Sequence, residues 1–166
     1  MKILLVGGSG FLGAWVARFL HINQCLARIF DPNKPDSEWH RLSGIRADAT
    51  EWVAGDVSKK SELDDAIRDC EGVINLAGLL TPECSQNPVR GAEVNLIGAI
   101  NVFEGALKHG LKKVAYTSSI GVYGPDHAEF PEPTTHYGSF KLASEGVARA
   151  FFEEHGISSL GVRPFV

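Results

Sequence analysis

The chain has few of the residues that build disulfide frameworks or metal sites. It contains only three cysteines, Cys25, Cys70 and Cys84, which are widely spaced and form no Cys-x-x-Cys pair. Its six histidines are scattered and include no His-x-x-x-His pair. Isolated cysteines in odd number are typical of reduced thiols that fill space in a cytoplasmic protein. We therefore expect a cytoplasmic protein with no disulfide and no metal site.

The sequence also lacks a cluster of positive charge. The formal net charge is −4 at pH 7, and Lys112-Lys113 is only an isolated pair. Nucleic acids and anionic membrane surfaces bind grouped lysines and arginines, so neither is expected as a partner. The apolar start, Lys2 to Val6, is too short for a signal peptide and is expected to be a core strand.

Apolar segments typical of strands alternate with longer segments typical of helices. Strands are expected at residues 2–6, 26–30, 50–54, 72–76, 113–118 and 158–162. Helices are expected between them, including 89–109 and 137–155. This alternation predicts an α/β fold, a doubly wound parallel sheet of the Rossmann type, because parallel strands need crossover helices. The length and the 44% apolar content fit one domain over residues 1–166.

Two connections have weaker signals. Ser58 or Ser61 is expected to cap the helix that reaches Arg68. The segment from Pro32 to Ala47 contains two prolines and shows little periodicity, so we expect a surface loop with one helical turn.

A glycine turn, Gly7-x-x-Gly10-x-x-Gly13, joins the first strand to the first helix. The first glycine permits a tight turn, the second lets the backbone approach a pyrophosphate, and the third lets the helix pack on the strand. The unpaired amides and positive dipole end of the helix suit a dianion. We therefore predict a dinucleotide site, although a glycine turn without a ligand is the alternative interpretation.

Asp31 ends the second strand at the position expected for a ribose ligand. A carboxylate there accepts hydrogen bonds from the ribose hydroxyls and repels a 2′-phosphate. We therefore expect NAD rather than NADP, with Lys34 as the one nearby residue that would suit a phosphate.

Further candidates follow the third and fourth strands, because ligands of such sheets lie beyond the carboxyl ends of the strands. Asp56 either accepts from the adenine amino group beside the apolar wall of Val57, or belongs to a helix N-cap region. Ala77 and Gly78 are small where a cofactor backbone must pass, and close helix packing would explain them equally well.

The chemistry is expected from Tyr137 and Lys141, which are four residues apart and therefore share a helix face. A neighbouring cation favours the phenolate, which lowers the barrier for a tyrosine whose ordinary pKa is about 10. Ser119, at the end of the fifth strand, can donate a hydrogen bond to the same substrate oxygen.

Seven segments together resemble the extended short-chain dehydrogenase/reductase family, in particular its NAD-dependent epimerase/dehydratase branch. They are Gly7 to Gly13, Gly55 to Val57, Asn75 to Gly78, Asn95 to Val102, Thr117 to Gly124, Tyr137 to Glu145, and Arg163-Pro164. The resemblance implies that Tyr137 is the catalytic acid/base, that Lys141 holds the nicotinamide ribose, that Ser119 positions the substrate oxygen, and that Asn95 supports the site. The cofactor-binding set is then Gly7, Gly10, Phe11, Leu12, Gly13, Asp31, Asp56, Val57, Leu76, Ala77, Gly78, Asn95, Tyr137 and Lys141.

Two departures from the family pattern matter. Dehydrating members carry an Asp-Glu pair after the serine position, where this chain has Ile120-Gly121, so epimerisation or simple dehydrogenation is expected instead. The chain stops at Phe165-Val166, where family members continue into a substrate domain, so a fragment is expected. The substrate is expected to be a sugar or sugar nucleotide, with Thr81 and His127 as local candidates for contact.

Two other functions stay open: a non-catalytic NAD-binding regulatory module, and a dimerising assembly protein. The helix over residues 89–109 presents a wide stripe that predicts a homodimer, formed with the helix of Tyr137 as a four-helix bundle. The stripe comprises Val89, Ala92, Glu93, Leu96, Ile97, Ile100, Phe103, Glu104 and Leu107.

Overall fold

A six-stranded parallel sheet forms the centre of the molecule. The computed structural model describes residues 1–125 and 129–165. The strands are β1 (Lys2–Val6), β2 (Leu26–Phe30), β3 (Glu51–Val53), β4 (Gly72–Asn75), β5 (Lys113–Thr117) and β6 (Ser158–Val162). Their order in the sheet is β3-β2-β1-β4-β5-β6. The winding therefore reverses between β1 and β4, which confirms the predicted doubly wound sheet.

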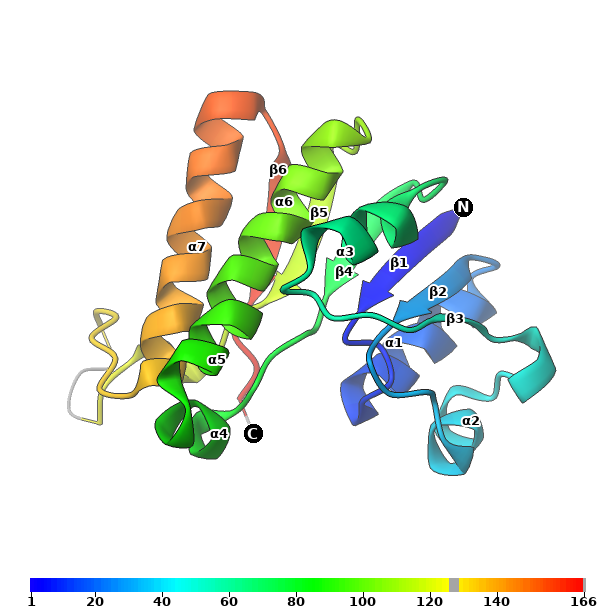
Figure 1. The fold of residues 1–166 in the computed structure, drawn as a ribbon, viewed down its shortest axis with the longest axis horizontal. Helices are drawn as coiled ribbons and strands as arrows, with labels where there is room; N and C mark the ends of the chain where they lie inside the picture. The colour runs from blue at the N-terminus through cyan, green and yellow to red at the C-terminus, as the bar shows by residue number, and fades with distance from the viewer. Residues whose placement is uncertain (126–128, 166) are drawn as a thin grey trace.

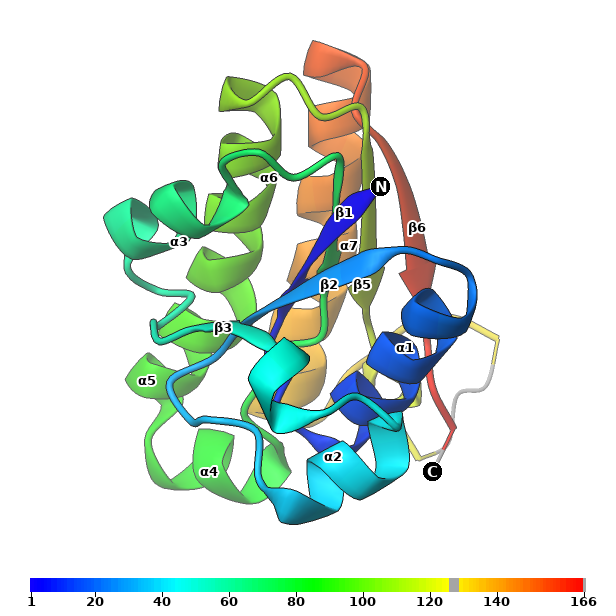
Figure 2. The same ribbon diagram turned by 90° about the vertical axis from the view of Figure 1, so that its right-hand side faces the viewer.

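Helices cover both faces of this sheet (Figures 1 and 2). One face carries α1 (Phe11–Ile22) and α2 (Ser37–Ser43). The other carries α3 (Lys60–Ile67), α6 (Gly98–Lys108) and α7 (His136–His155). Alternate residues of β1 supply the two cores: Ile3 and Leu5 face α1, while Leu4 and Val6 face α3 and α6.

The segment between β2 and β3 is more regular than predicted. It contains the two-turn helix α2, whose first turn is capped by Asp36 accepting from the backbone N of Trp39 at 2.8 Å. Gly44 ends the helix in the left-handed conformation at φ 71°. Trp39 is only 2% exposed, so burial of one large side chain orders a stretch with little periodicity.

The predicted serine cap of α3 is wrong. The helix begins at Lys60 with Lys59 as N-cap and no side-chain cap bond. Ser58 instead donates to the Asp56 carboxylate through both its backbone N and its hydroxyl. The short side chain of Ser58 bonds to the carboxylate two residues away, so it stabilises the loop before α3 and does not cap the helix.

The long helix predicted over residues 89–109 is divided into three parts. They are α5 (Pro88–Ala92), the π-helical segment η2 (Glu93–Ile97) and α6. The short helix α4 (Thr81–Gln86) precedes them. Gly110, at φ 73°, follows the last turn as expected. A π-helical turn inside a helix is frequent at functional sites, and this one contains Asn95.

Candidate functional site

A cavity of about 400 Å³ opens where the carboxyl ends of the central strands meet. It is lined by the ends of β1, β2 and β4, by the loop after β3, and by Arg90 and Val94 from the α5–η2 region. The predicted cofactor-binding residues on its wall are Gly7, Gly10, Asp31, Asp56, Val57, Leu76, Ala77 and Gly78. The fold thus brings together residues from four separate segments of the sequence.

The glycine loop has no room for side chains where it packs against protein, and it has free space where it borders the cavity. Gly7 has φ 71°, and a Cβ built on it would lie 2.6 Å from the backbone N of Ala77. A Cβ on Gly13 would lie 2.1 Å from the carbonyl O of Gly8, so only glycine allows α1 to pack there. The nearest atom to a Cβ on Gly10 is 4.0 Å away. The backbone at Gly10 is therefore accessible from the cavity.

The amino end of α1 is available to an anion. Gly10 is the N-cap of this 12-residue helix and offers no side-chain cap bond to the first amides. The first turn also carries no acidic residue. Phe11 and Leu12 are 73% and 45% exposed at this end. The loop and helix terminus together fit the pyrophosphate of a dinucleotide.

Asp31 holds the glycine loop and the β2–α2 loop together. Its Oδ2 accepts from the backbone N of Ser9 at 3.2 Å, and its Oδ1 accepts from the backbone N of Asn33 at 2.9 Å. Beneath the loop, the indole Nε1 of Trp39 donates to the carbonyl O of Gly8 at 2.8 Å. Sequence reasoning missed Trp39; the available signal was that it is the largest of the three large apolar side chains in this segment, the others being Leu42 and Ile45.

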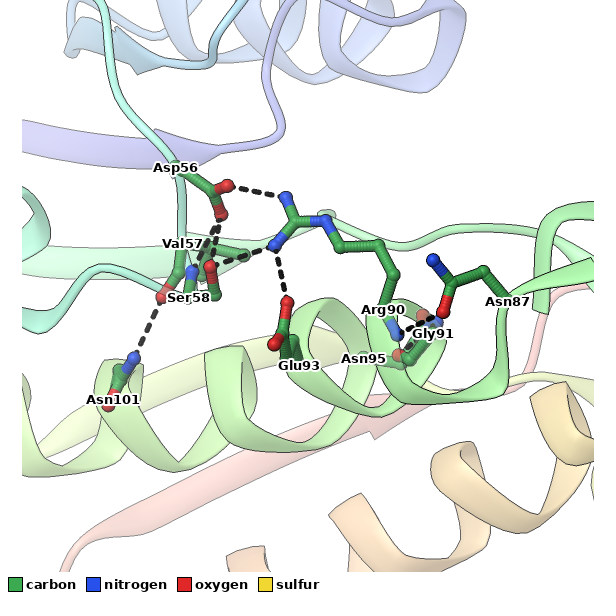
Figure 3. A network of polar contacts seen from close by, with 9 residues as sticks. All are labelled: Asp56, Val57, Ser58, Asn87, Arg90, Gly91, Glu93, Asn95 and Asn101. Atoms are coloured by element: carbon green, nitrogen blue, oxygen red, sulfur yellow. Dashed lines mark hydrogen bonds and ion pairs between the residues drawn. The ribbon is translucent and has the colours of Figure 1, made fainter.

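Asp56 combines features of both predicted roles, and its contact with adenine stays a prediction. Its carboxylate borders the cavity, as the adenine interpretation requires, and it also organises the turn before α3. Figure 3 shows Arg90, which sequence reasoning missed, reaching from α5 to this carboxylate and forming an ion pair with it. Burial raises the pKa of Asp56, but the hydrogen bonds from Ser58 and the Arg90 pair outweigh it and lower the pKa overall.

Tyr137 and Lys141 share a face of α7, as predicted from their spacing. The Lys141 Nζ lies 5.8 Å from the centre of the Tyr137 ring. The first turn of α7 packs against the short turn Ile120–Val122, because a Cβ on Gly138 would lie 2.0 Å from the carbonyl O of Gly121. This close packing brings Tyr137 next to the Ser119 loop.

The position of Ser119 follows from the same turn. Its Oγ accepts from the backbone N of Gly121 at 3.0 Å. A Cβ built on Gly121 would lie 3.3 Å from the Ser119 Oγ and 3.6 Å from the Tyr137 Cδ1. The serine and the tyrosine therefore border the same small space.

Lys141 is buried beside the wall of the cavity. The residue is 4% exposed, and its Nζ donates to the carbonyl O of Thr117 at 2.9 Å. Burial disfavours the ammonium and lowers the pKa of Lys141 to about 8. A Cβ on Gly78 would lie 3.3 Å from the Nζ. Gly78, which has no side chain, therefore lies between this ammonium and the cavity.

Asn95 lies next to Lys141, against the same side of Gly78. Its Nδ2 donates to the carbonyl O of Leu79 at 3.0 Å and to that of Gly91 at 3.1 Å. Its Oδ1 is buried without a hydrogen-bond partner in the part of the chain that the structure describes, and it lies 2.8 Å from a Cβ built on Gly78. A buried acceptor of this kind is costly unless a bound group satisfies it.

Other expectations have simpler outcomes. Thr81 is exposed at the start of α4, and His127 lies outside the described residues. Cys25, Cys70 and Cys84 are free thiols. Over residues 1–125 and 129–165, no group of three or more His, Cys, Asp or Glu side chains is arranged to hold a metal. In the same ranges, no helix combines the length and apolar character needed to cross a membrane.

A family model matches almost the whole chain. The model of the NAD dependent epimerase/dehydratase family matches residues 3–166. The chain belongs to the NAD-dependent epimerase/dehydratase family. NAD is accordingly its cofactor, as predicted, whereas the roles of Asp31 and the glycine loop in holding it stay predictions.

Known relatives are epimerases and dehydrogenases. The bifunctional UDP-glucose 4-epimerase and UDP-xylose 4-epimerase 1 of Pisum sativum is 32% identical over 164 residues, covering 89% of this chain and 47% of that protein. The uronate dehydrogenase of Pseudomonas putida is 28% identical over 171 residues, covering 98% of this chain and 59% of that protein. The chain thus spans about half the length of the curated relatives it matches.

Solved structures show the same fold. UDP-glucose 4-epimerase from Thermotoga maritima superposes with a TM-score of 0.87 at 24% identity, covering 98% of this chain and 55% of that one. The holo form of a GalE-like L-threonine dehydrogenase from Cupriavidus necator gives a TM-score of 0.86 at 26% identity, with coverages of 98% and 54%. The six-stranded Rossmann fold is therefore that of the family.

Proposed function

We propose that the chain carries the cofactor site and acid/base group of an oxidoreductase that moves a hydride between NAD and a hydroxyl or ketone of a sugar. The observation that supports this proposal is the placement of Tyr137 and Lys141 on one face of α7, with the ammonium next to the cavity wall at Gly78. A sugar nucleotide is the favoured substrate class, because relatives named for UDP-sugar epimerisation match most of the chain.

NAD would be held by the glycine loop, by Asp31 at the ribose and by Val57 at the base. When bound, it supplies the acceptor or donor of the hydride. The dinucleotide would run along the wall formed by Leu76, Ala77 and Gly78, and its reactive end would then lie towards Lys141.

Tyr137, Lys141 and Ser119 each have a separate role at the substrate oxygen. The Tyr137 phenol takes or returns the proton of that oxygen, and the neighbouring Lys141 ammonium stabilises the phenolate. The Ser119 hydroxyl accepts from Gly121 and directs its own hydrogen to the substrate oxygen. With its pKa at about 8, Lys141 is mostly protonated at neutral pH and can fulfil this role.

Epimerisation or dehydrogenation is favoured over dehydration. Elimination of water needs an additional acid/base pair, and the positions after Ser119 are Ile120 and Gly121. These residues form a short turn packed on α7, so their backbone supports the site instead of contributing a carboxylate.

The decisive experiment compares dinucleotide binding with turnover. Tyr137→Phe should leave NAD affinity nearly unchanged and lower sugar-nucleotide turnover about a hundredfold, because it removes only the proton carrier. Ser119→Ala should lower turnover by an intermediate factor. Tyr116→Phe is the matched control for Tyr137→Phe: Tyr116 is a tyrosine buried on β5, and its replacement should leave turnover nearly unchanged. NAD binding should be measured in this chain. The turnover of wild type and variants should be measured in the longest in-frame product of its gene, because this chain spans about half the length of its curated relatives.

The same assays separate the alternatives. A regulatory module would bind NAD and show no turnover even in the longest product, and an assembly protein would dimerise without binding NAD. A Tyr137→Phe variant with wild-type turnover would contradict the proposed mechanism.

We also propose a homodimer formed by the α5–α6 region and α7. Val89 and Ile97 are 70% and 43% exposed there and support an apolar contact. Phe103 does not belong to that surface: it is 1% exposed and packs in the core, so this part of the predicted stripe is wrong. Sedimentation at micromolar concentration tests the proposal, and a strictly monomeric mass would contradict it.

A further inference from the structure

Arg90 joins two walls of the cavity that are distant in sequence. Its guanidinium forms an ion pair with Asp56, and its Nη1 donates to the Ser58 Oγ at 3.0 Å and to the Glu93 Oε2 at 3.1 Å. In Figure 3 the side chain extends from its helix to the loop after β3. Three acceptors therefore hold one guanidinium at the rim of the cavity.

The Asp56 carboxylate is anchored on both of its oxygens. Oδ1 accepts from the backbone N of Ser58 at 2.9 Å and from its Oγ at 2.8 Å, while Oδ2 contacts the Arg90 Nη2. Rotation of an aspartate carboxylate is otherwise broad, so the second anchor decides where Oδ2 points. A carboxylate offers about four lone-pair positions, which leaves one on Oδ2 for a further donor.

The surroundings of that position fit the edge of a flat base. Phe30, Val57 and Val94 line the cavity near Asp56 and provide apolar contact. The carbonyl O of Val57 accepts from the Asn101 Nδ2 at 2.9 Å, which fixes the backbone next to the carboxylate. A base with an amino group on its edge would satisfy Oδ2, whereas a base with a carbonyl there would place two acceptors against each other.

We propose that Arg90 sets the base specificity of the dinucleotide pocket, by holding Asp56 so that its one remaining acceptor position selects a 6-aminopurine over a 6-oxopurine. Arg90 is thus a positioning residue that acts through Asp56. The inference rests on the proposed placement of NAD in this cavity, and it concerns binding rather than turnover.

Calorimetric titration with two dinucleotides tests this role. The probes are NAD and nicotinamide hypoxanthine dinucleotide, which differ in the 6-amino and 6-oxo groups of the base. The wild-type chain should bind NAD about tenfold more tightly, as expected for one hydrogen bond to a charged acceptor. Arg90→Met keeps the length of the side chain and removes its donors, and should reduce the preference to about threefold or less.

Two further variants show whether Arg90 acts through Asp56. Asp56→Ala should abolish the preference, and adding Arg90→Met to it should change the ratio of affinities no further. Glu93→Gln is the control, because it alters another partner of Arg90 and leaves the Asp56 contact in place, so it should retain the tenfold preference. Thermal unfolding of each variant verifies that it is folded.

The possible outcomes separate this inference from the proposed reaction. An Arg90→Met variant with the full preference, or one that changes the ratio in the Asp56→Ala background, would overturn the role of Arg90. A wild-type chain that binds neither dinucleotide would overturn both the inference and the placement of NAD. Selective binding without sugar turnover in the longest product would support the inference and contradict only the proposed reaction.

Discussion

Replacement of Lys141 by methionine should stabilise the NAD-free protein at neutral pH. The ammonium is 4% exposed, and burial lowers its pKa from 10.5 to about 8. The unfolded chain therefore binds more protons than the folded chain between these values. Stability must rise with pH across that window, and the full cost of burying the charge is present below pH 8.

The size of this cost follows from the shift in pKa. A difference of about 2.5 pKa units corresponds to about 3 kcal/mol at pH 7, and the residual cost at pH 10 is about 1 kcal/mol. Methionine also leaves the carbonyl O of Thr117 without its lysine donor, at a cost of about 1 to 2 kcal/mol. We therefore expect Lys141→Met to be about 1 to 2 kcal/mol more stable at pH 7.

Urea unfolding at several pH values measures the effect. The difference in unfolding free energy between variant and wild type should shrink by about 2 kcal/mol from pH 7 to pH 10. Only the cost of burying the ammonium changes with pH, whereas packing and the lost bond to Thr117 contribute the same free energy at both pH values. Lys112→Met is the matched control, because it is the same substitution at an exposed lysine. Its difference from wild type should stay constant with pH.

The same variant should bind NAD more weakly than wild type, because the proposed ribose contact is lost. A gain in stability with a loss of binding is the signature of a charge kept for function at a cost to folding. A Lys141→Met difference that does not change between pH 7 and pH 10 would refute the reasoning, as would a difference that grows with pH.

Two further substitutions test the cofactor loop. Asp31→Ala should reduce the difference between the NAD and NADP affinities, because it removes the carboxylate that would face a 2′-phosphate. Calorimetric titration of both dinucleotides measures this difference. An unchanged ratio of affinities would contradict the assignment of Asp31 as the ribose ligand. Gly13→Ala should destabilise the fold by at least about 2 kcal/mol in urea unfolding, since its Cβ would lie 2.1 Å from the Gly8 carbonyl O. Gly10→Ala, with open space at that position, should leave stability nearly unchanged and weaken NAD binding.

The sequence by itself determined the fold class, the cofactor and the order of the strands along the chain. These features depend on local patterns: alternating apolar segments, a glycine turn between a strand and a helix, and an acidic residue at the end of the second strand. The spacing of Tyr137 and Lys141 likewise placed them on one helix face, because helical geometry alone decides that relation.

Only the tertiary structure decided how the long helix is divided, how α2 is ordered, and what Arg90 contacts. The π-helical segment η2, which contains Asn95, depends on packing against Gly78 and α7. The helix α2 depends on burial of Trp39 beneath the glycine loop. Arg90 and Asp56 are 34 residues apart, and no local pattern links two such positions. Contacts of this kind arise when separate segments pack, so their partners are absent from any window of sequence.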